Sequence, residues 1–583
     1  MSAMSSIGAG WRMTTSVSSR SCTSACTRST AFVRTSGCDR GRAVMSGASS
    51  QPPSRLARDS LIVGAATILS RLLGFARDVL IARLLGTGPV ADAFLAALRL
   101  PNLVRRVLGE GGLNAPFVPL YLAIKTERGE EAAKRFAGAA ASQLGLLLIG
   151  FVVLAEIFAP WVVLGLAGGF AEEPQTLALA AFYTRLMLPF VLLTTLAALL
   201  AALLNAEGRF TVAALAPALM NAILLAALLM ELFRGSDSHA SATLLAACLS
   251  LTGLAHLAMI LWRLRGIGLP RPSLRWSPDM TRLVKTGGAT LLAASAAQLV
   301  LLVSTQIAST EPGSVSALYY ADRVFQLPLS FFGVAMGTVV LSAMAGERSQ
   351  ADHDALLGRA LALGLALAVP AATALFVLAE PIVSVLFENG QFGVADRQRT
   401  AAALAAFALG LPFALAAKVF GQVYFVRRQP RLPLIAGFAA VAIAALAGFL
   451  LLDWRNAAII GALAASLAFI VQAGLLAIDL LRTGLWRPRW ADARTILAIL
   501  LATALMVLVL NVATGPLLPA LNPGEPVLRR AGALALLCCA GAATYAAAGF
   551  MLGAFDAVLP PRLLRLRGAS VRTPRSGADR PRL

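Results

Sequence analysis

The segment from Ser70 to Pro119 most limits what this chain can fold into. It reads as two membrane-spanning helices, yet it carries six arginines and three acidic residues. One charge at the centre of a membrane helix costs about 2.5–3.5 kcal/mol, so helices this charged are not expected to face lipid. We predict that they line a polar cavity, and the excess of arginine favours an anionic ligand. The charged residues are Arg71, Arg77, Asp78, Arg83, Asp92, Arg99, Arg105, Arg106 and Glu110.

The rest of the chain is apolar in long runs. Of its 583 residues 58% are hydrophobic and only 14% are charged, which is unlike a soluble globular protein. The runs are long enough to span a bilayer as helices, so we predict an all-α polytopic membrane protein with about 14 transmembrane helices. The expected spans are 61–85, 90–123, 137–165, 175–206, 210–233, 240–264, 282–310, 314–345, 355–378, 397–426, 432–452, 456–481, 493–513 and 527–552.

The net charge of +21 is concentrated at both ends of the chain and in alternate connections between the spans. Positive residues stay on the cytoplasmic side of a membrane, so both termini are predicted to be cytoplasmic. Nucleic-acid binding is not expected, because no soluble domain would organise it. The basic connections are 125–135, 263–285, 427–431 and 482–494.

An internal repeat divides the spans. Three segments recur at offsets of 227, 221 and 223 residues. GPVADAFLAALRLP at 88–101 aligns with VSALYYADRVFQLP at 315–328, APWVVLGL at 159–166 aligns with EPIVSVLF at 380–387, and LPF at 188–190 aligns with LPF at 411–413. Parallel repeats are typical of transporters with a substrate site between the repeats, so we expect two parallel six-helix lobes around a central cavity plus two C-terminal helices. The expected divisions are a basic tail or misassigned start at 1–58 (Met45 being the favoured start), a first lobe at 59–270, a second lobe at 271–484, the appended helices at 485–555 and a basic cytoplasmic tail at 556–583.

The charged residues fall on shared helix faces. Arg71 and Asp78 are seven residues apart, and in the second repeat Asp322 and Arg323 form a weaker counterpart. Guanidinium groups bind phosphate in fork geometry. The cavity is therefore predicted to hold Arg71, Arg77, Arg105, Arg106 and Arg323, balanced by Asp78, Asp92, Glu110 and Asp322, with Lys418 as a further candidate. An alternative for Arg83, Arg99 and Arg106 is a set of structural salt bridges, and we expect these three to be structural or auxiliary.

Catalytic motifs are almost absent from the chain. It contains no phosphate-binding GxxxxGK[ST] motif and no arrangement of nucleophile, histidine and acid. The six cysteines support neither a disulfide framework nor a zinc site. We therefore predict a transporter rather than an enzyme, with no metal and no cofactor, and with ion or membrane-potential coupling as the energy source.

Three strings, SRLLGFARDVLIARLLG at 70–86, LRLPNLVRRVLGEGGLNAPFVP at 98–119 and YYADRVFQLP at 319–328, resemble the MurJ/MviN family of lipid II flippases. That family belongs to the multidrug/oligosaccharidyl-lipid/polysaccharide exporter superfamily. The resemblance implies translocation of lipid II, the undecaprenyl-pyrophosphate-linked peptidoglycan precursor, from the cytoplasmic to the periplasmic leaflet of the bacterial inner membrane by alternating access. It also implies a lipid-facing groove at 485–555 and contact with the peptidoglycan synthesis machinery.

By motif position, the resemblance places substrate-binding residues at Arg71, Arg77, Arg105, Arg323, Ser70, Asp92, Asn102 and Ser316. Some family members have glutamate where this chain has Gln326, so ion coupling through that acid is not implied here. Three other functions stay open: a flippase for another lipid-linked glycan, a polyprenyl-phosphate glycosyltransferase, and a scaffold that does not transport.

Overall fold

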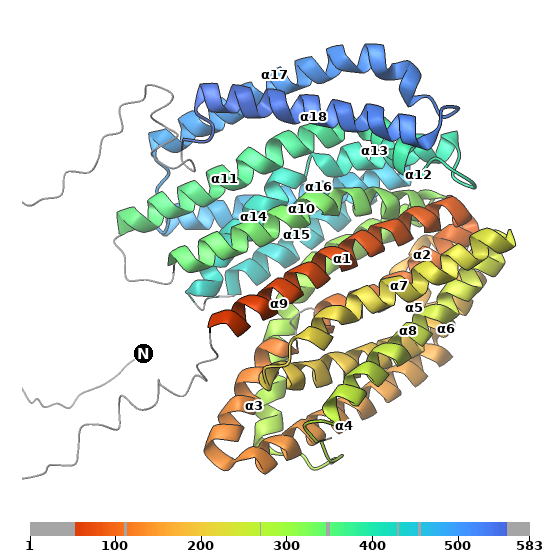
Figure 1. Ribbon diagram of the computed structural model, residues 1–583, viewed down its shortest axis with the longest axis vertical. Coiled ribbons are helices and arrows are strands. Elements are labelled where there is room, and N and C mark those ends of the chain that lie inside the picture. Colours follow the sequence, from red (N-terminus) through yellow and green to blue (C-terminus); the bar gives the residue numbers. More distant parts are fainter. Residues whose placement is uncertain are drawn as a thin grey trace, which may run out of the picture. The chain divides into compact units, whose positions relative to one another are not determined.

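The computed structural model describes residues 53–109, 113–268, 270–344, 350–427, 429, 431–452 and 456–556. In this part every regular element is a helix (Figure 1), and nine helices are long and apolar enough to cross a membrane. A tenth span results if α13 (Val394–Ala408) and α14 (Leu411–Val426), which meet at 41°, count as one. The prediction of an all-α polytopic membrane protein is confirmed. Nearly all of the expected tails, and Met45, lie outside the described residues.

The helices up to residue 264 form what we call the first helix group. They are α1 (Pro53–Leu85), α2 (Pro89–Val104), the π-helix η1 (Arg105–Gly109), α3 (Asn114–Arg128), α4 (Glu130–Ile157), α5 (Ala159–Leu166), the 3-10 helix η2 (Gly168–Glu172), α6 (Pro174–Ala206), α7 (Thr211–Arg234) and α8 (Ser238–Leu264). Within the group α6 packs against α8, α2 and α4. The expected span 90–123 is broken, because α2 passes into a π-helix after Pro101 and α3 starts anew at Asn114.

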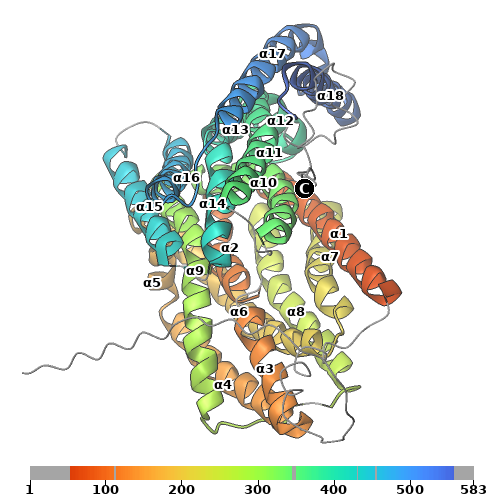
Figure 2. The same cartoon turned by 90° about the vertical axis from the view of Figure 1, so that its left-hand side faces the viewer.

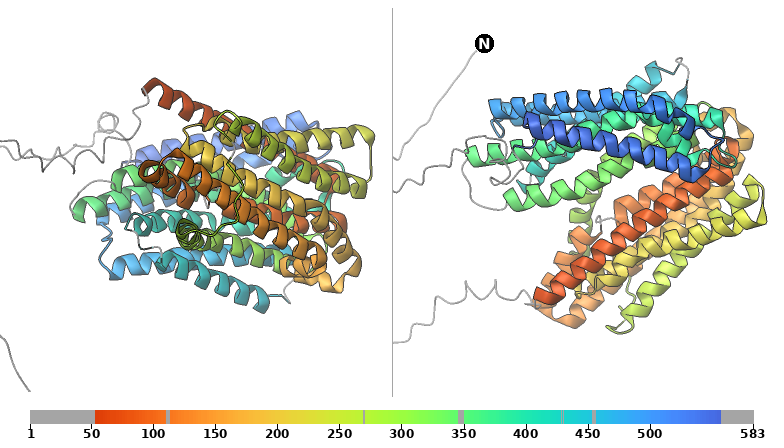
Figure 3. Two further views of the ribbon diagram at one scale, coloured as in Figure 1. Left: turned by 90° about the horizontal axis from the view of Figure 1, so that it is seen from below. Right: turned by 45° about the horizontal axis from the view of Figure 1, so that its top comes forward.

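The second helix group follows, and an appended pair completes the described chain. The second group consists of α9 (Pro278–Ala308), α10 (Ser314–Met344), α11 (Gln350–Val377), α12 (Ala379–Phe387), α13, α14, α15 (Arg431–Leu450) and α16 (Ala457–Arg482). The appended pair consists of α17 (Trp490–Leu521) and α18 (Val527–Leu552), which lie side by side next to α11 (Figures 1 and 3). The short helices α5 and α12 hold equivalent places in the order of elements, each starting at an alanine close to a proline.

Two features join the groups. The largest buried apolar cluster takes residues from α1 and α2 as well as from α10, α13 and α16. In α2 the alanines at 91, 93, 96 and 97 are fully buried, and such small side chains allow helices to approach closely. Helix α9 contacts α3 and α4 of the first group as well as α15 and α16 of its own (Figure 2).

A buried arginine fastens the appended pair to the second group. Arg530 in α18 is 1% exposed, and its Nη2 donates to the carbonyl and the hydroxyl oxygen of Ser384 in α12 at 2.6 and 2.7 Å. The same nitrogen lies 3.6 Å from a carboxylate oxygen of Glu388. Glu388 in turn accepts hydrogen bonds from Arg397 of α13 at 3.0 and 3.1 Å. This network orients α18 on α12 and α13.

We expect Arg530→Met to destabilise the purified protein by roughly 3 kcal/mol, because it removes charge-assisted hydrogen bonds from a buried site. The matched control is Arg529→Met, whose side chain is 60% exposed and paired with Glu525. A surface pair contributes less than about 1 kcal/mol. Thermal unfolding in detergent compares the two, and equal melting temperatures would refute the role given to Arg530.

Candidate functional site

Arg77 and Asp78 form a buried ion pair on α1. The Nε and Nη2 atoms of Arg77 donate to Oδ1 of Asp78 at 3.0 and 2.7 Å, and Nη1 donates to Oδ1 of Asn221 at 2.9 Å. Asn221, on α7, also donates from its amide to the carbonyl oxygen of Ser70 at 2.9 Å. The Arg77 guanidinium is therefore fixed on both sides within the first helix group, and only 8% of the residue is exposed.

Arg323 brings α10 of the second group to this pair. Its Nε lies 3.6 Å from Oδ2 of Asp78, and its guanidinium lies over the Tyr319 ring at 4.4 Å from the centroid. The Tyr319 hydroxyl donates to Oδ1 of Asp78 at 3.3 Å. Such a cation–π contact orients the guanidinium without occupying its N–H groups. Asp78 is thus shared by arginines from both groups, as the sequence predicted for charges of opposite sign in one cavity.

Arg106, at the π-helix, makes a second link between the groups. Its Nη2 donates to Oε1 of Gln326 at 2.8 Å, and Gln326 donates to Asp322 at 2.5 Å. The positive charges of Arg106 and Arg71 both act on Lys418, an exposed residue of α14. Cations from α1, the π-helix and α14 therefore gather in one region, where a polyanion would relieve their mutual repulsion.

A narrow cavity of about 20 Å³ lies between the two links. Its polar lining comes from both groups: Arg99, Asn102, Arg106, Gln298 and Arg323. Two buried nitrogens of Arg99, Nε and Nη2, have no hydrogen-bond partner among the described residues. Arg99 was expected to be structural or auxiliary, and because it lines this cavity together with Arg323 and has nitrogens without a partner, we add it to the candidate site.

Asp92 closes the first group against the second. It is 1% exposed, and its two carboxylate oxygens accept hydrogen bonds from the backbone N–H of Gly313 at 2.6 Å and from the N–H and hydroxyl of Ser316 at 2.7 and 2.6 Å. These donors belong to the start of α10, where a carboxylate offsets the helix dipole. In this conformation neither Asp92 nor Ser316 is open to a ligand, and together they join the groups.

Neighbouring contacts extend this junction. The Tyr320 hydroxyl donates to the carbonyl oxygen of Gly86 at 3.1 Å, and the Gln391 N–H donates to the carbonyl oxygen of Arg83 at 2.9 Å. Gly86 has a φ of +63°, and a Cβ there would lie 2.5 Å from the Gln391 carbonyl oxygen. The close approach at this end of the molecule therefore requires a glycine.

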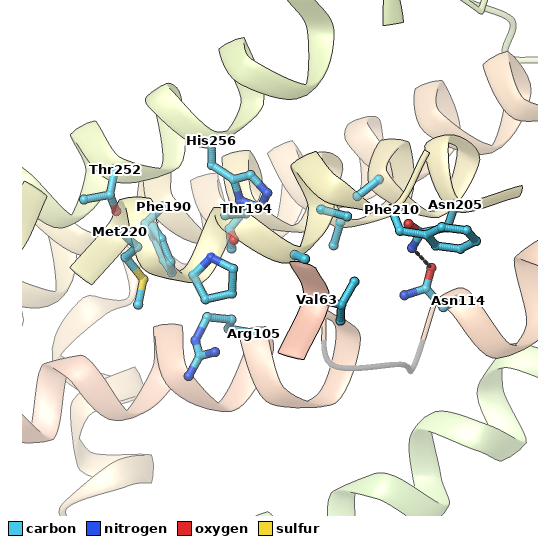
Figure 4. Close-up of a pocket in the computed structure, with 16 residues that line it drawn as sticks. Val63, Arg105, Asn114, Phe190, Thr194, Asn205, Phe210, Met220, Thr252 and His256 are labelled. Atoms are coloured by element: carbon cyan, nitrogen blue, oxygen red, sulfur yellow. Dashed lines mark hydrogen bonds between the residues drawn. The ribbon is translucent and has the colours of Figure 1, made fainter. Parts of the chain in front are cut away.

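Arg105 lies apart from the Arg77–Asp78–Arg323 cluster. It lines a cavity of about 320 Å³ within the first group, between α1, the π-helix, α3, α6, α7 and α8. Besides Arg105, the polar side chains around this cavity are Asn114, Thr194, Asn205, Thr252 and His256 (Figure 4). Arg105 follows Arg99 by six residues, which is a rotation of about 240° around the helix, so the two side chains face different cavities. The Glu110 prediction lies outside the described residues.

Two residues of the site, Asn221 and Tyr319, were not among the predicted site residues. Asn221 is a lone amide in an apolar helix, and its position against Arg77 cannot be read from α7 alone. Tyr319 stands four residues before Arg323, so their contact follows from helical spacing and could have been predicted. No group of three or more histidine, cysteine, aspartate or glutamate side chains able to hold a metal occurs within the described residues.

Comparisons with known proteins bear on the family. A family model described as "Lipid II flippase MurJ" matches residues 81–522. A "Probable lipid II flippase MurJ" of Rhizobium meliloti is 36% identical over 535 residues, covering 89% of this chain and 98% of the relative. A "Lipid II flippase MurJ" of Burkholderia cenocepacia is 31% identical over 444 residues, covering 74% and 85%.

Two solved structures share the fold. One is titled "Lipid II flippase MurJ, inward closed conformation" and aligns with a TM-score of 0.71 at 24% identity, covering 84% of this chain and 98% of that one. The other is an inward-facing multidrug resistance MATE family transporter, with a TM-score of 0.58 at 16% identity, covering 71% and 95%. At these identities the likeness concerns the fold alone.

Proposed function

Because the chain belongs to the lipid II flippase MurJ family, we propose that it is a lipid II flippase, a transporter and not an enzyme. Its substrate is the undecaprenyl-pyrophosphate-linked precursor of peptidoglycan, which it moves from the cytoplasmic to the periplasmic leaflet for cell-wall synthesis. The protein is a multi-pass membrane protein. We place it in the bacterial inner membrane with both termini cytoplasmic, on the distribution of arginine and lysine along the chain.

One observation carries the proposal: cationic side chains from both helix groups line one narrow cavity. Arg99 and Arg106 come from the first group, and Arg323 comes from the second. A diphosphate between a sugar–peptide head and a prenyl tail is the part of lipid II that such a site recognises, because guanidinium forks bind phosphate oxygens in pairs. The tail can stay in lipid while the head occupies the site.

The junction at Asp92 supports alternating access. In the proposed orientation the connection between α1 and α2 is periplasmic, so the structure is closed at its periplasmic end by Asp92, Gly313 and Ser316. Parting this junction while closing the opposite end would expose the site to the other leaflet. We propose the membrane potential as the drive, since one charge crossing 100 mV gains about 2.3 kcal/mol and the emptied site returns with a net positive charge. Contact with the peptidoglycan synthesis machinery stays a proposal from the resemblance.

The test is Arg323→Ala in a strain depleted of its own copy of the protein. We expect complementation to fail and lipid II to accumulate, because the variant loses the second group's guanidinium while Asp78 keeps Arg77 as its partner. Loss of an interaction of this kind costs about 1.5–3 kcal/mol, or ten- to hundredfold in rate.

The matched control is Arg482→Ala, an exposed arginine in the last turn of α16. It should complement fully at equal expression. A strain rescued by Arg323→Ala as well as by the control would contradict the flippase site, and accumulation of a different lipid-linked glycan would favour a related flippase.

A further inference from the structure

A charged pair on the outer surface of the first helix group takes no part in the transport site. Arg185 of α6 is exposed, and its Nε donates to the backbone carbonyl oxygen of Glu156 at the end of α4, at 3.2 Å. This is the one hydrogen bond of the Arg185 side chain among the described residues, and the Nη1–Nη2 edge of its fork makes none. The half-buried Glu156 carboxylate feels the Arg185 charge but forms no salt bridge with it in the described part. Both groups can therefore accept a further partner.

Exposed apolar residues surround this pair. Leu154 and Phe158 on either side of Glu156 are 58% and 51% exposed, and Phe182, one turn before Arg185, is 41% exposed. Trp161 on α5 is 72% exposed. In a protein that spans a membrane, such a surface faces lipid. Aromatic side chains with polar neighbours are typical of the level at which lipid head groups begin.

The helix lengths put the pair at that level. Along α4, Glu156 lies 19 residues after Ala137, where the expected third span begins, and this is about 29 Å at 1.5 Å per residue. Along α6, Arg185 lies 20 residues before Asn205, near the end of that helix, which is about 30 Å. Both distances match the roughly 30 Å thickness of the hydrocarbon core. Helix α4 ends one residue after Glu156, which places the pair near the far boundary of the bilayer, and α6, which begins at Pro174, extends beyond that level.

The pair belongs to the first group only. The repeat offsets of 221 and 223 residues place Val377 and Ala408 at the equivalent positions of the second group, and neither can carry a charge. The short helix α12 of the second group has an ion pair at other positions, between Nε of Arg397 and Oε1 of Glu380 at 3.2 Å, so both of those charges already have a partner.

We propose that Arg185 and Glu156 bind the head group of a phospholipid that carries an amine, of the phosphatidylethanolamine type. The Nη1–Nη2 edge of Arg185 receives the phosphate oxygens, and the Glu156 carboxylate accepts hydrogen bonds from the ammonium group. A purely anionic lipid would satisfy Arg185 but meet the negative charge of Glu156, and a choline head group offers Glu156 no N–H. In the orientation proposed above, the site lies in the periplasmic leaflet. It does not depend on which substrate the protein transports.

The experiment uses the full chain, purified and delipidated in detergent, with retained lipids counted by native mass spectrometry. Phosphatidylethanolamine, phosphatidylglycerol and phosphatidylcholine are added separately and in pairs. We expect the wild type to retain phosphatidylethanolamine preferentially, Arg185→Leu to retain about tenfold less of it, and Glu156→Gln to reverse the preference over phosphatidylglycerol.

Arg529→Leu is the control, because it removes another exposed arginine of the described chain that already has an acidic partner. It should keep the wild-type lipid preference. Thermal melts without added lipid confirm that each variant folds. Equal retention of phosphatidylethanolamine by wild type and Arg185→Leu would overturn the site, and an unchanged preference in Glu156→Gln would overturn its specificity for an amine.

Discussion

Asp92→Ala is expected to part the two helix groups at the junction that α10 begins, and to abolish transport. The carboxylate accepts three hydrogen bonds, at 2.6–2.7 Å, from donors more than 220 residues away in the chain. Hydrogen bonds to a charged group contribute about 1.5–3 kcal/mol each, so their joint loss reaches about 5 kcal/mol. That is roughly the free energy that moves a two-state equilibrium from 99:1 to 1:99.

Distance measurements between spin labels at Ala178 and Ala395 follow the junction directly. Both residues are exposed, and they lie near the starts of α6 in the first group and α13 in the second. In a background without native cysteines, the wild type should give one narrow distance distribution, and Asp92→Ala should give a distribution that is broader or centred at a longer distance. Complementation should fail in parallel, since a transporter held open at one end cannot complete its cycle.

Asp237→Ala is the matched control for this experiment. Asp237 also caps a helix, accepting a hydrogen bond from the Ala240 N–H at 3.1 Å, but helix and cap both belong to the first group. Its loss costs about 1 kcal/mol of local stability and should leave the distance unchanged. If the distance distribution broadens equally in both variants, the change reports the loss of a helix cap in general and not the opening of the junction at Asp92.

Much of this fold could be predicted, because apolar runs and breaks are local properties of the sequence. Each expected span corresponds to one helix or to consecutive helices, such as α13 with α14. The contact of Arg77 and Arg323 with Asp78 could also be predicted, because charged side chains within membrane segments face the protein interior and pair with one another. The internal repeat indicated that Arg323 of the second group would contribute to the same cavity.

Two features of the site could not be predicted, for different reasons. The partners of Asp92 include backbone N–H groups, which every non-proline residue has. The sequence therefore does not indicate that Gly313 donates a hydrogen bond to Asp92. Arg99 and Arg106 are seven residues apart and both line the narrow cavity, as α-helical spacing predicts, whereas Arg105 lies on a different face and lines the larger cavity. That the Arg99 guanidinium keeps two nitrogens without a partner depends on its neighbours from α9 and α10, which spacing within α2 does not give.

Asp78→Ala is expected to reduce the amount of folded protein more than any single substitution of the arginines around it. Asp78 is 3% exposed, accepts two hydrogen bonds from Arg77 and one from Tyr319, and lies 3.6 Å from Arg323. Without the carboxylate, two guanidinium groups remain near each other in a buried site. Removing one partner of a buried ion pair costs about 3–5 kcal/mol. The yield of monodisperse protein and its melting temperature measure the loss.

The double variant Arg77→Met/Asp78→Leu separates folding from transport. Apolar side chains of similar size often replace a buried ion pair with little loss of stability, so the melting temperature should recover toward that of the wild type. Transport should not recover, because Asp78 also holds Arg323 over the Tyr319 ring. If the double variant complements, Asp78 serves the fold alone. If it is stable but inactive, the pair serves transport as well as the fold, through the Arg77 guanidinium, through the carboxylate beside Arg323 or through both, which a purely structural ion pair would not do.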